Sequence, residues 1–215
     1  MEKRIEKTIK NLVKNNMEVF FVEDREQALN TLKSILKPDC SVAVGGSVTL
    51  NEVGVLDLLR NGEYNFYDRY SAKTEQERRD LFRKGFVADY FICSSNAITE
   101  NGELYNVDGT ANRISAIAYG PDNVVIIAGV NKIVSNLQAA ILRVKTVSAP
   151  LNAKRLGIET YCSKKGHCMS LDFSGDEMCS GCNSEGRICR DYLVSSAQAV
   201  KGRIKVILVN ESLGY

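Results

Sequence analysis

Three short segments combine glycines, hydroxyl groups and one lysine in the pattern of an anion-binding site. Their candidate ligand-binding residues are Gly45, Gly46, Ser47, Asp108, Gly109, Thr110, Asn131 and Lys132. Glycines let a ligand approach the backbone closely, and the free N–H groups at the start of a helix attract anions. A lysine in such a place can neutralise a phosphate or a carboxylate. We therefore predict that these residues hold a small anionic metabolite.

Each segment also has an ordinary structural explanation. Ser47 or Thr49 can cap a helix, with Glu52 completing a capping box. Asp108 can stabilise a turn, and Lys132 can be a solvated surface lysine. The two interpretations are compatible for the first segment, because a capped helix start can still bind an anion.

Cysteines in residues 160–190 form a second candidate site, for a metal. They are Cys162, Cys168, Cys179, Cys182 and Cys189. The C-x-x-C spacing lets one turn present two thiolates, and four thiolates satisfy zinc or an iron–sulfur cluster. The spacing matches neither a doubled zinc-ribbon motif nor a ferredoxin motif. A loop of reduced thiols and a site filled only in a partner complex therefore stay open as alternatives. By contrast, we expect Cys40 and Cys93 to be buried apolar side chains.

The apolar pattern predicts the secondary structure that positions these residues. Stripes at helical spacing alternate with short β-branched or apolar runs over residues 17–147. Largely apolar runs at residues 90–94, 124–128 and 204–209 are typical of strands covered on both faces. We predict an α/β fold, Rossmann-like, with a largely parallel sheet flanked by helices. Ligands bind at the carboxyl ends of such strands, where the three segments fall.

Finer features follow from capping and breaking residues. We expect a single helix around residues 50–59, and a capping box of Thr74 and Glu77 at the start of another helix. Ser135 is expected to cap a helix that runs to about Val147, and Pro150 to close this part of the chain. Residues 160–190 lose the periodicity and are expected to form an irregular, cysteine-rich appendage within a single α/β domain spanning residues 1–215.

Composition excludes several classes of function. The 28 Lys and Arg residues against 26 Asp and Glu residues leave a net charge of +2, which gives no footprint for nonspecific nucleic-acid binding. No apolar run approaches the roughly 20 residues that span a bilayer. The first 15 residues mix acidic and basic side chains and do not form a secretory signal. We therefore expect a cytoplasmic protein with no nucleic-acid or membrane partner.

Three sequence runs together resemble the LUD-domain family, named for lactate utilisation. They are GGSVTLNEVG at residues 45–54, ADYFICSSNAITENGELYNVDGTANRISAIAYGPDNVVIIAGVNKIV at residues 88–134, and PLNAKRLG at residues 150–157. That family is similar in fold to the group of ribose-5-phosphate isomerase, glucosamine-6-phosphate deaminase and CoA-transferase. The resemblance implies a sheet that holds phosphorylated or CoA-like ligands at its strand ends. It also implies a role in organic-acid oxidation beside an iron–sulfur protein partner.

The same resemblance bears on catalysis. Sugar-phosphate isomerases of the wider group carry an aspartate after the strand that matches residues 90–94, where this chain has Asn96. An amide is no general base, so we expect Asn96 to orient a ligand by hydrogen bonds. CoA-transferases use a glutamate nucleophile, and Glu100 stands in a similar tripeptide, although its Asn-Gly neighbours also fit a hairpin tip.

Three functions therefore stay open: a metabolite-binding protein, a metal-carrying redox or assembly subunit, and an acyl-CoA transferase that uses Glu100. Whether the protein is an enzyme is not decided by the sequence. Related folds often form symmetric dimers, so we expect a homo-oligomer.

Overall fold

Six parallel strands form the central sheet in the computed structural model, which describes residues 2–215. In spatial order the strands are β1 (Glu18–Val22), β10 (Ile204–Val209), β7 (Asn123–Gly129), β4 (Tyr90–Cys93), β2 (Ser41–Val44) and β3 (Asn65–Tyr67). All four residues of β4 are buried, as its continuous apolar sequence predicts. The parallel α/β fold is confirmed, and β10 lies in this sheet between β1 and β7.

Helices cover both faces of the central sheet. One face packs against α1 (Lys3–Lys14) and α6 (Asn112–Tyr119), and the other against α2 (Arg25–Ile35), α3 (Val48–Val53) and α4 (Val55–Asn61). Along β7 the side chains alternate between the two cores: Val124 and Ile126 join the first, Val125 and Ile127 the second. This double covering explains why the strand is apolar at successive positions.

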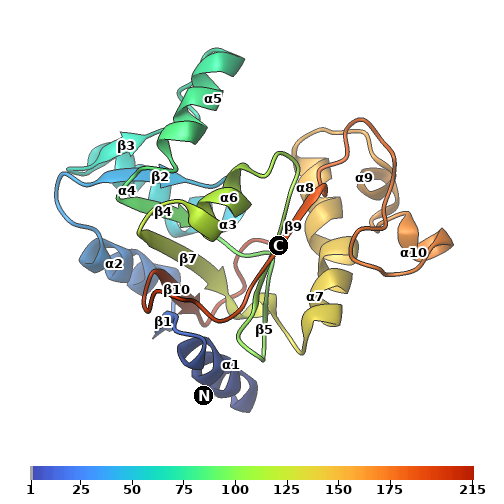
Figure 1. Ribbon diagram of the computed structural model, residues 1–215, viewed down its shortest axis with the longest axis horizontal. Coiled ribbons are helices and arrows are strands. Elements are labelled where there is room, and N and C mark those ends of the chain that lie inside the picture. The colour runs from blue at the N-terminus through green and yellow to red at the C-terminus, as the bar shows by residue number, and fades with distance from the viewer. Residues whose placement is uncertain (1) are drawn as a thin grey trace.

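The helix α5 (Glu75–Lys84) projects from the body of the molecule (Figure 1) and buries none of its residues. Its predicted capping box is confirmed: the Thr74 hydroxyl accepts the Glu77 N–H at 3.1 Å. The box stabilises the start of a helix that has little packing of its own.

A second sheet, which the sequence pattern did not predict, lies beside the central one. It consists of β8 (Ile133–Val134), β5 (Ala97–Thr99), β6 (Leu104–Asp108) and β9 (Asp191–Ser195), with β6 antiparallel to both of its neighbours. In Figure 1 it lies between the central sheet and α7 (Leu137–Arg143), the π-helical turn η2 (Val144–Ser148) and α8 (Ala149–Arg155). Tyr105, Ile141 and Val144 belong to the core between these layers.

Three local expectations were wrong, each because of a single residue. Gly54, with φ at +82°, ends α3 and divides the expected helix into two. Asn136 rather than Ser135 caps α7, because its side chain accepts the Ala139 N–H at 2.9 Å. Pro150 does not close the segment but lies in the first turn of α8, which continues directly from the π-helical turn η2.

The segment of residues 160–190 is largely irregular, as expected. It holds two short helices, α9 (Tyr161–Lys165) and α10 (Ser170–Phe173), and packs beside α8. Across residues 2–215, no helix combines the length and apolar character that crossing a membrane requires.

Candidate functional site

A cavity of about 300 Å³ lies at the carboxyl ends of the central strands. Its walls include the loops after β2, β3, β4, β6 and β7, the helix α8 and residue 215. The cavity brings together seven of the nine residues predicted to bind a ligand: Gly46, Ser47, Asn96, Asp108, Gly109, Thr110 and Lys132. The three sequence segments thus meet in one place.

Gly45 and Asn131 lie outside the cavity lining and have structural contacts. A Cβ on Gly45 would come within 2.9 Å of the Cys93 Cβ, so only glycine fits there. The Asn131 side chain accepts the Leu213 N–H at 3.1 Å and donates to the Gly214 carbonyl at 3.4 Å. Asn131 therefore fixes the segment after β10, whose Tyr215 lines the cavity.

Lys132 places a buried amine in the site. It ends the short 3-10 helix η1 (Val130–Lys132), directly after β7, and is only 3% exposed. Its Nζ donates hydrogen bonds to Thr49 Oγ1 and Ser94 Oγ, both at 2.8 Å. Burial, together with the nearby Arg143 and Arg113 guanidinium groups, lowers the pKa of Lys132 to about 7. The alternative of a solvated surface lysine is therefore wrong.

The capping alternatives for the first segment are resolved by the contacts of Ser47, Thr49 and Glu52. Ser47 is the N-cap of α3, accepting the Leu50 N–H at 3.4 Å, whereas Thr49 lies inside the helix. Glu52 completes no capping box; its carboxylate accepts the Gly214 N–H at 2.6 Å.

Asp108 and Arg113 form a buried ion pair that shapes one wall. Arg113 Nη2 lies 2.7 Å from Asp108 Oδ1, and the other guanidinium hydrogens reach Ser94 O at 3.0 Å and Asn96 Oδ1 at 2.8 Å. Asp108 Oδ2 accepts the backbone N–H groups of Arg113 and Ile114 at the start of α6. Because these groups satisfy one another, the pair holds the loops in place and offers little free charge.

Two further arginines line the cavity with no carboxylate partner among residues 2–215. The Arg69 guanidinium lies 4.5 Å from the centre of the Phe82 ring, and burial lowers its pKa. Arg155 donates only to neutral oxygens, on Asn152 at 2.8 Å and Tyr215 at 2.8 Å. Arg69 and Arg155 thus give the cavity a positive character, to which Lys132 adds in its protonated form.

Sequence reasoning missed Arg69, Arg113 and Arg155 as site residues. Arg113 left a usable signal, since it is a charged residue beside Ile114 on the buried side of α6. Arg155 lies in the PLNAKRLG run, but nothing in its spacing indicated a ligand. Arg69 follows a strand of only three residues and left no signal.

Glu100 lies away from the cavity lining, in the turn between β5 and β6. It forms ion pairs with Arg4 at 3.2 Å and Lys7 at 3.0 Å, and hydrogen bonding to Lys7 lowers the pKa of its carboxyl. Acyl transfer at Glu100 stays a prediction from the sequence, without support from the surroundings of this residue.

The cysteine segment encloses a second, smaller cavity of about 20 Å³. Cys162, Cys168, Cys182 and Cys189 line it, whereas Cys179 is exposed and does not. All seven cysteines are free thiols, and Cys40 and Cys93 are buried as expected. Within residues 2–215, no three His, Cys, Asp or Glu side chains converge in an arrangement that would hold a metal ion.

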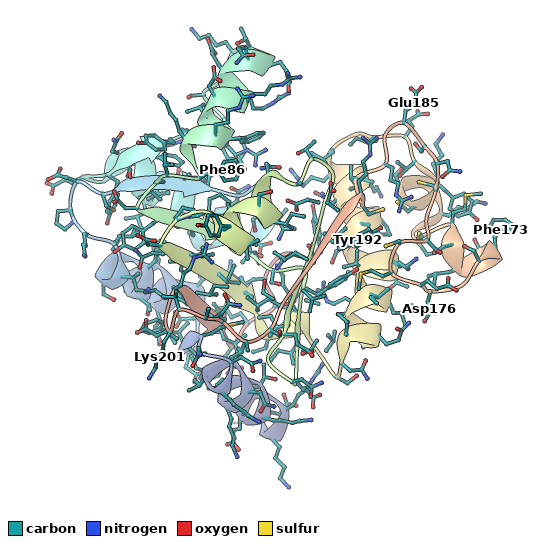
Figure 2. The ribbon with its side chains drawn as sticks, viewed as in Figure 1. Phe86, Phe173, Asp176, Glu185, Tyr192 and Lys201 are labelled. Carbon is teal, nitrogen blue, oxygen red and sulfur yellow. The ribbon has the colours of Figure 1, made fainter. Side chains whose placement is uncertain are left out.

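Two cationic side chains lie close to these cysteines. Lys145, 5% exposed, donates to Ser170 Oγ and to the Ser180 carbonyl, both at 2.6 Å. Arg187 donates to the carbonyls of Cys179, Cys182 and Cys189. In Figure 2 Tyr192 lies at the inner side of this part of the molecule, and Glu185 and Phe173 at its outer rim. The cysteine cavity is thus a site separate from the cationic one.

Known structures share similarity with this chain over all or part of its length. A DUF162 family protein from Deinococcus radiodurans aligns over 96% of this chain and 96% of its own, with a TM-score of 0.53 and 12% identity. A ribose-5-phosphate isomerase in complex with phospho-erythronic acid aligns over 53% of this chain and 55% of its own, at 16% identity and a TM-score of 0.38. The ribose 5-phosphate isomerase of Plasmodium falciparum aligns over 52% of each chain, at 19% identity and a TM-score of 0.35.

A search of the curated proteins found no match to this sequence. The family model of the LUD domain, in contrast, matches residues 5–209 and so spans nearly the whole chain. The first structural comparison shows a shared fold over the same length. This protein belongs to the LUD domain family.

Proposed function

We propose that this LUD-domain protein binds a small carboxylated or phosphorylated metabolite in the cationic cavity, in the service of lactate-type organic-acid utilisation. The observation that carries the proposal is the charge imbalance of the lining. Arg69, Arg155 and Lys132 have no carboxylate partner in the described chain, and the one acidic lining residue, Asp108, is already paired with Arg113. Cations in a recess that partly excludes water attract an anion more strongly than cations on an open surface.

The shape of the cavity favours a ligand of a few carbon atoms. Its volume of about 300 Å³ stands at the lower end of the range for small-molecule sites. A Cβ on Gly46 would lie 3.4 Å from Arg69 Nη1, in van der Waals contact, so Gly46 and the Arg69 guanidinium are neighbours on the cavity wall. Ser47, Thr110 and Asn96 add neutral hydrogen-bonding groups to the walls. A lactate or a short sugar phosphate matches these dimensions better than a whole CoA molecule.

Thermal unfolding and calorimetric titration with lactate, inorganic phosphate, ribose 5-phosphate and CoA test this proposal. At constant ionic strength, at least one carboxylate or phosphate compound should raise the melting temperature, whereas chloride should not. Arg69→Met should weaken binding about tenfold or more, because a hydrogen bond to a charged group contributes roughly 1.5–3 kcal/mol.

The matched control is Arg79→Met on α5, where Arg79 is exposed and lies 3.7 Å from Glu75. This variant should bind as the wild type does. The proposal fails when none of the compounds raises the melting temperature, or when Arg69→Met and Arg155→Met both bind like the wild type.

A second candidate function is that of a metal-carrying redox or assembly subunit, and the feature behind it is the group of cysteines that lines the second cavity. Thiolates suit zinc and iron–sulfur clusters, and Cys162, Cys168, Cys182 and Cys189 all line one cavity. Within residues 2–215 no three of these side chains converge on a common point, so metal binding would require them to rearrange. The nearby cations Lys145 and Arg187 would offset part of the negative charge of bound thiolates. Zinc would supply structural cross-linking, and a cluster would supply electron transfer with an iron–sulfur partner protein.

Elemental analysis of anaerobically purified protein decides this second candidate. Zinc or iron should be present in the wild type and lost in Cys182→Ala. Cys40→Ala, which removes a buried cysteine in a different core, should keep the metal. A metal-free protein in which all seven thiols titrate with a thiol reagent would contradict metal binding.

A further inference from the structure

We propose that Lys132 is a nucleophile that forms an imine with an aldehyde or ketone carrying a carboxylate or phosphate group. The inference rests on the proposed function, because it gives the anionic metabolite a reactive carbonyl group. Three features of the structure carry it: the position of the Lys132 amine in the cavity, its two hydroxyl partners, and the free cations on other walls.

The surroundings of Lys132 favour the neutral amine, which is the form that attacks a carbonyl carbon. The side chain is 3% exposed, so the ammonium form loses hydration. The Arg143 and Arg113 guanidinium groups also disfavour a second positive charge, whereas Glu52 and Cys93 act weakly in the other direction. With its pKa lowered to about 7, a large fraction of Lys132 is uncharged at neutral pH.

The two hydroxyl partners orient the nitrogen. A neutral amine has two N–H bonds and one electron pair. Nζ has two hydrogen bonds, to Thr49 Oγ1 and Ser94 Oγ, both at 2.8 Å. When the amine donates both hydrogens, the electron pair is left for a carbonyl carbon in the cavity. The partners come from α3 and from the loop after β4, so two elements fix the nitrogen independently.

The reaction balances within the site and solvent. The electron pair of Nζ forms a bond to the carbonyl carbon, and the carbonyl oxygen takes up a proton to give a carbinolamine. The Ser94 and Thr49 hydroxyls lie within hydrogen-bond reach of the nitrogen and can pass protons between it and the oxygen. Loss of that oxygen as water leaves a C=N bond, so amine and carbonyl compound give imine and water without a further reactant.

The remaining cations explain why the carbonyl compound is expected to be anionic. Arg69 and Arg155 line the same cavity from the loop after β3 and from the end of α8. They can bind a carboxylate or phosphate while the carbonyl group faces Lys132. A neutral aldehyde would lack this attachment and is expected to react more slowly.

Reductive trapping of the full-length protein tests the inference. We would incubate it with pyruvate, glyoxylate or glyceraldehyde 3-phosphate, reduce with sodium cyanoborohydride, and locate adducts by peptide mass spectrometry. The expected result is a single adduct on Lys132 whose mass is that of the carbonyl compound minus one oxygen atom. Lys145 is an internal control, because it is also buried, at 5% exposure, but does not line this cavity.

Variants separate reactivity from folding. Lys132→Arg keeps a cation but cannot form an imine, so it should retain the circular dichroism of the wild type and give no adduct. Ser94→Ala keeps the nucleophile and should slow trapping severalfold.

The outcomes also separate this inference from the proposed function. Binding of lactate or phosphate without any Lys132 adduct overturns the inference and leaves the proposed function standing. Labelling of Lys145 and of exposed lysines to the same extent as Lys132 also overturns the inference. A Lys132 adduct without binding of anions that lack a carbonyl supports the inference and contradicts the broader proposal. Neither binding nor an adduct overturns both.

Discussion

Lys132 shows how a single residue acquires its properties from distant parts of the chain. Its place after an apolar strand is visible in the sequence, and the sequence therefore predicts a cation near the strand ends. Its lowered pKa depends on burial and on Arg113 and Arg143, whose proximity is created only by the fold. Local pattern thus identified the residue, whereas its chemistry required the tertiary structure.

The lowered pKa of Lys132 predicts a pH dependence of stability. The pKa is about 7 in the folded protein and 10.5 in the reference state. Between these values the unfolded chain holds a proton that the folded protein has lost, so the free energy of unfolding rises as the pH increases. Relative to Lys132→Met, the wild type should gain roughly 1 kcal/mol per pH unit in this window.

Urea unfolding of both proteins from pH 7 to pH 10 measures this difference. Lys10→Met, at an exposed position of α1, is the control and should leave the slope unchanged. Parallel stability curves for the wild type and Lys132→Met would contradict the account of the buried amine.

The start of α6 shows a compromise between backbone conformation and the site. Ala111, the N-cap of α6, has φ at +56°, in the left-handed region that disfavours residues with a Cβ. Its neighbours Thr110 and Asn112 both line the cationic cavity. The left-handed conformation of Ala111 thus lies within the loop after β6 that lines the site. The Ala111 side chain cannot cap α6, and the Asp108 carboxylate accepts the Arg113 N–H in its place.

Ala111→Gly should therefore increase the free energy of unfolding by up to about 1 kcal/mol, because glycine adopts this conformation without steric cost. Ala116→Gly is the matched control inside the same helix. It should decrease the free energy of unfolding by about 1 kcal/mol or more, since glycine disfavours a helix interior. Chemical denaturation measures both, and a loss of stability in Ala111→Gly would contradict the strain.

At the scale of the whole molecule, the sequence predicted the layered parallel sheet because its strands are buried on both faces. The apolar run of β4 and the largely apolar runs of β7 and β10 carry that information directly. The second sheet was missed because β5 and β8 have only three and two residues, and because β9 pairs with a strand far away in the sequence, Leu104 with Ser195. The hydrophobic periodicity of a short sequence window carries no information about pairing between such distant strands.

The candidate site also contains residues that the sequence predicted and residues that it did not. Loops after parallel strands meet at one edge, which is why Gly46 and Lys132 were correctly predicted to lie together. Asp108 was predicted there for the same reason, but it ends β6, an antiparallel strand of the second sheet, and reaches the cavity from that sheet. Arg69 and Arg155 reach the cavity from the loop after an edge strand and from a peripheral helix. A net charge of only +2 gives no indication that these arginines lie together in the fold. The positive character of the cavity is therefore a property of the folded molecule.

A crystal structure of the protein soaked with pyruvate, without reductant, tests the central claim most directly. The account predicts electron density for the ligand in the cationic cavity, its carboxylate within hydrogen-bond distance of Arg69 or Arg155 and its carbonyl carbon facing Lys132. A cavity without ligand density at a pyruvate concentration that saturates binding in solution would contradict it.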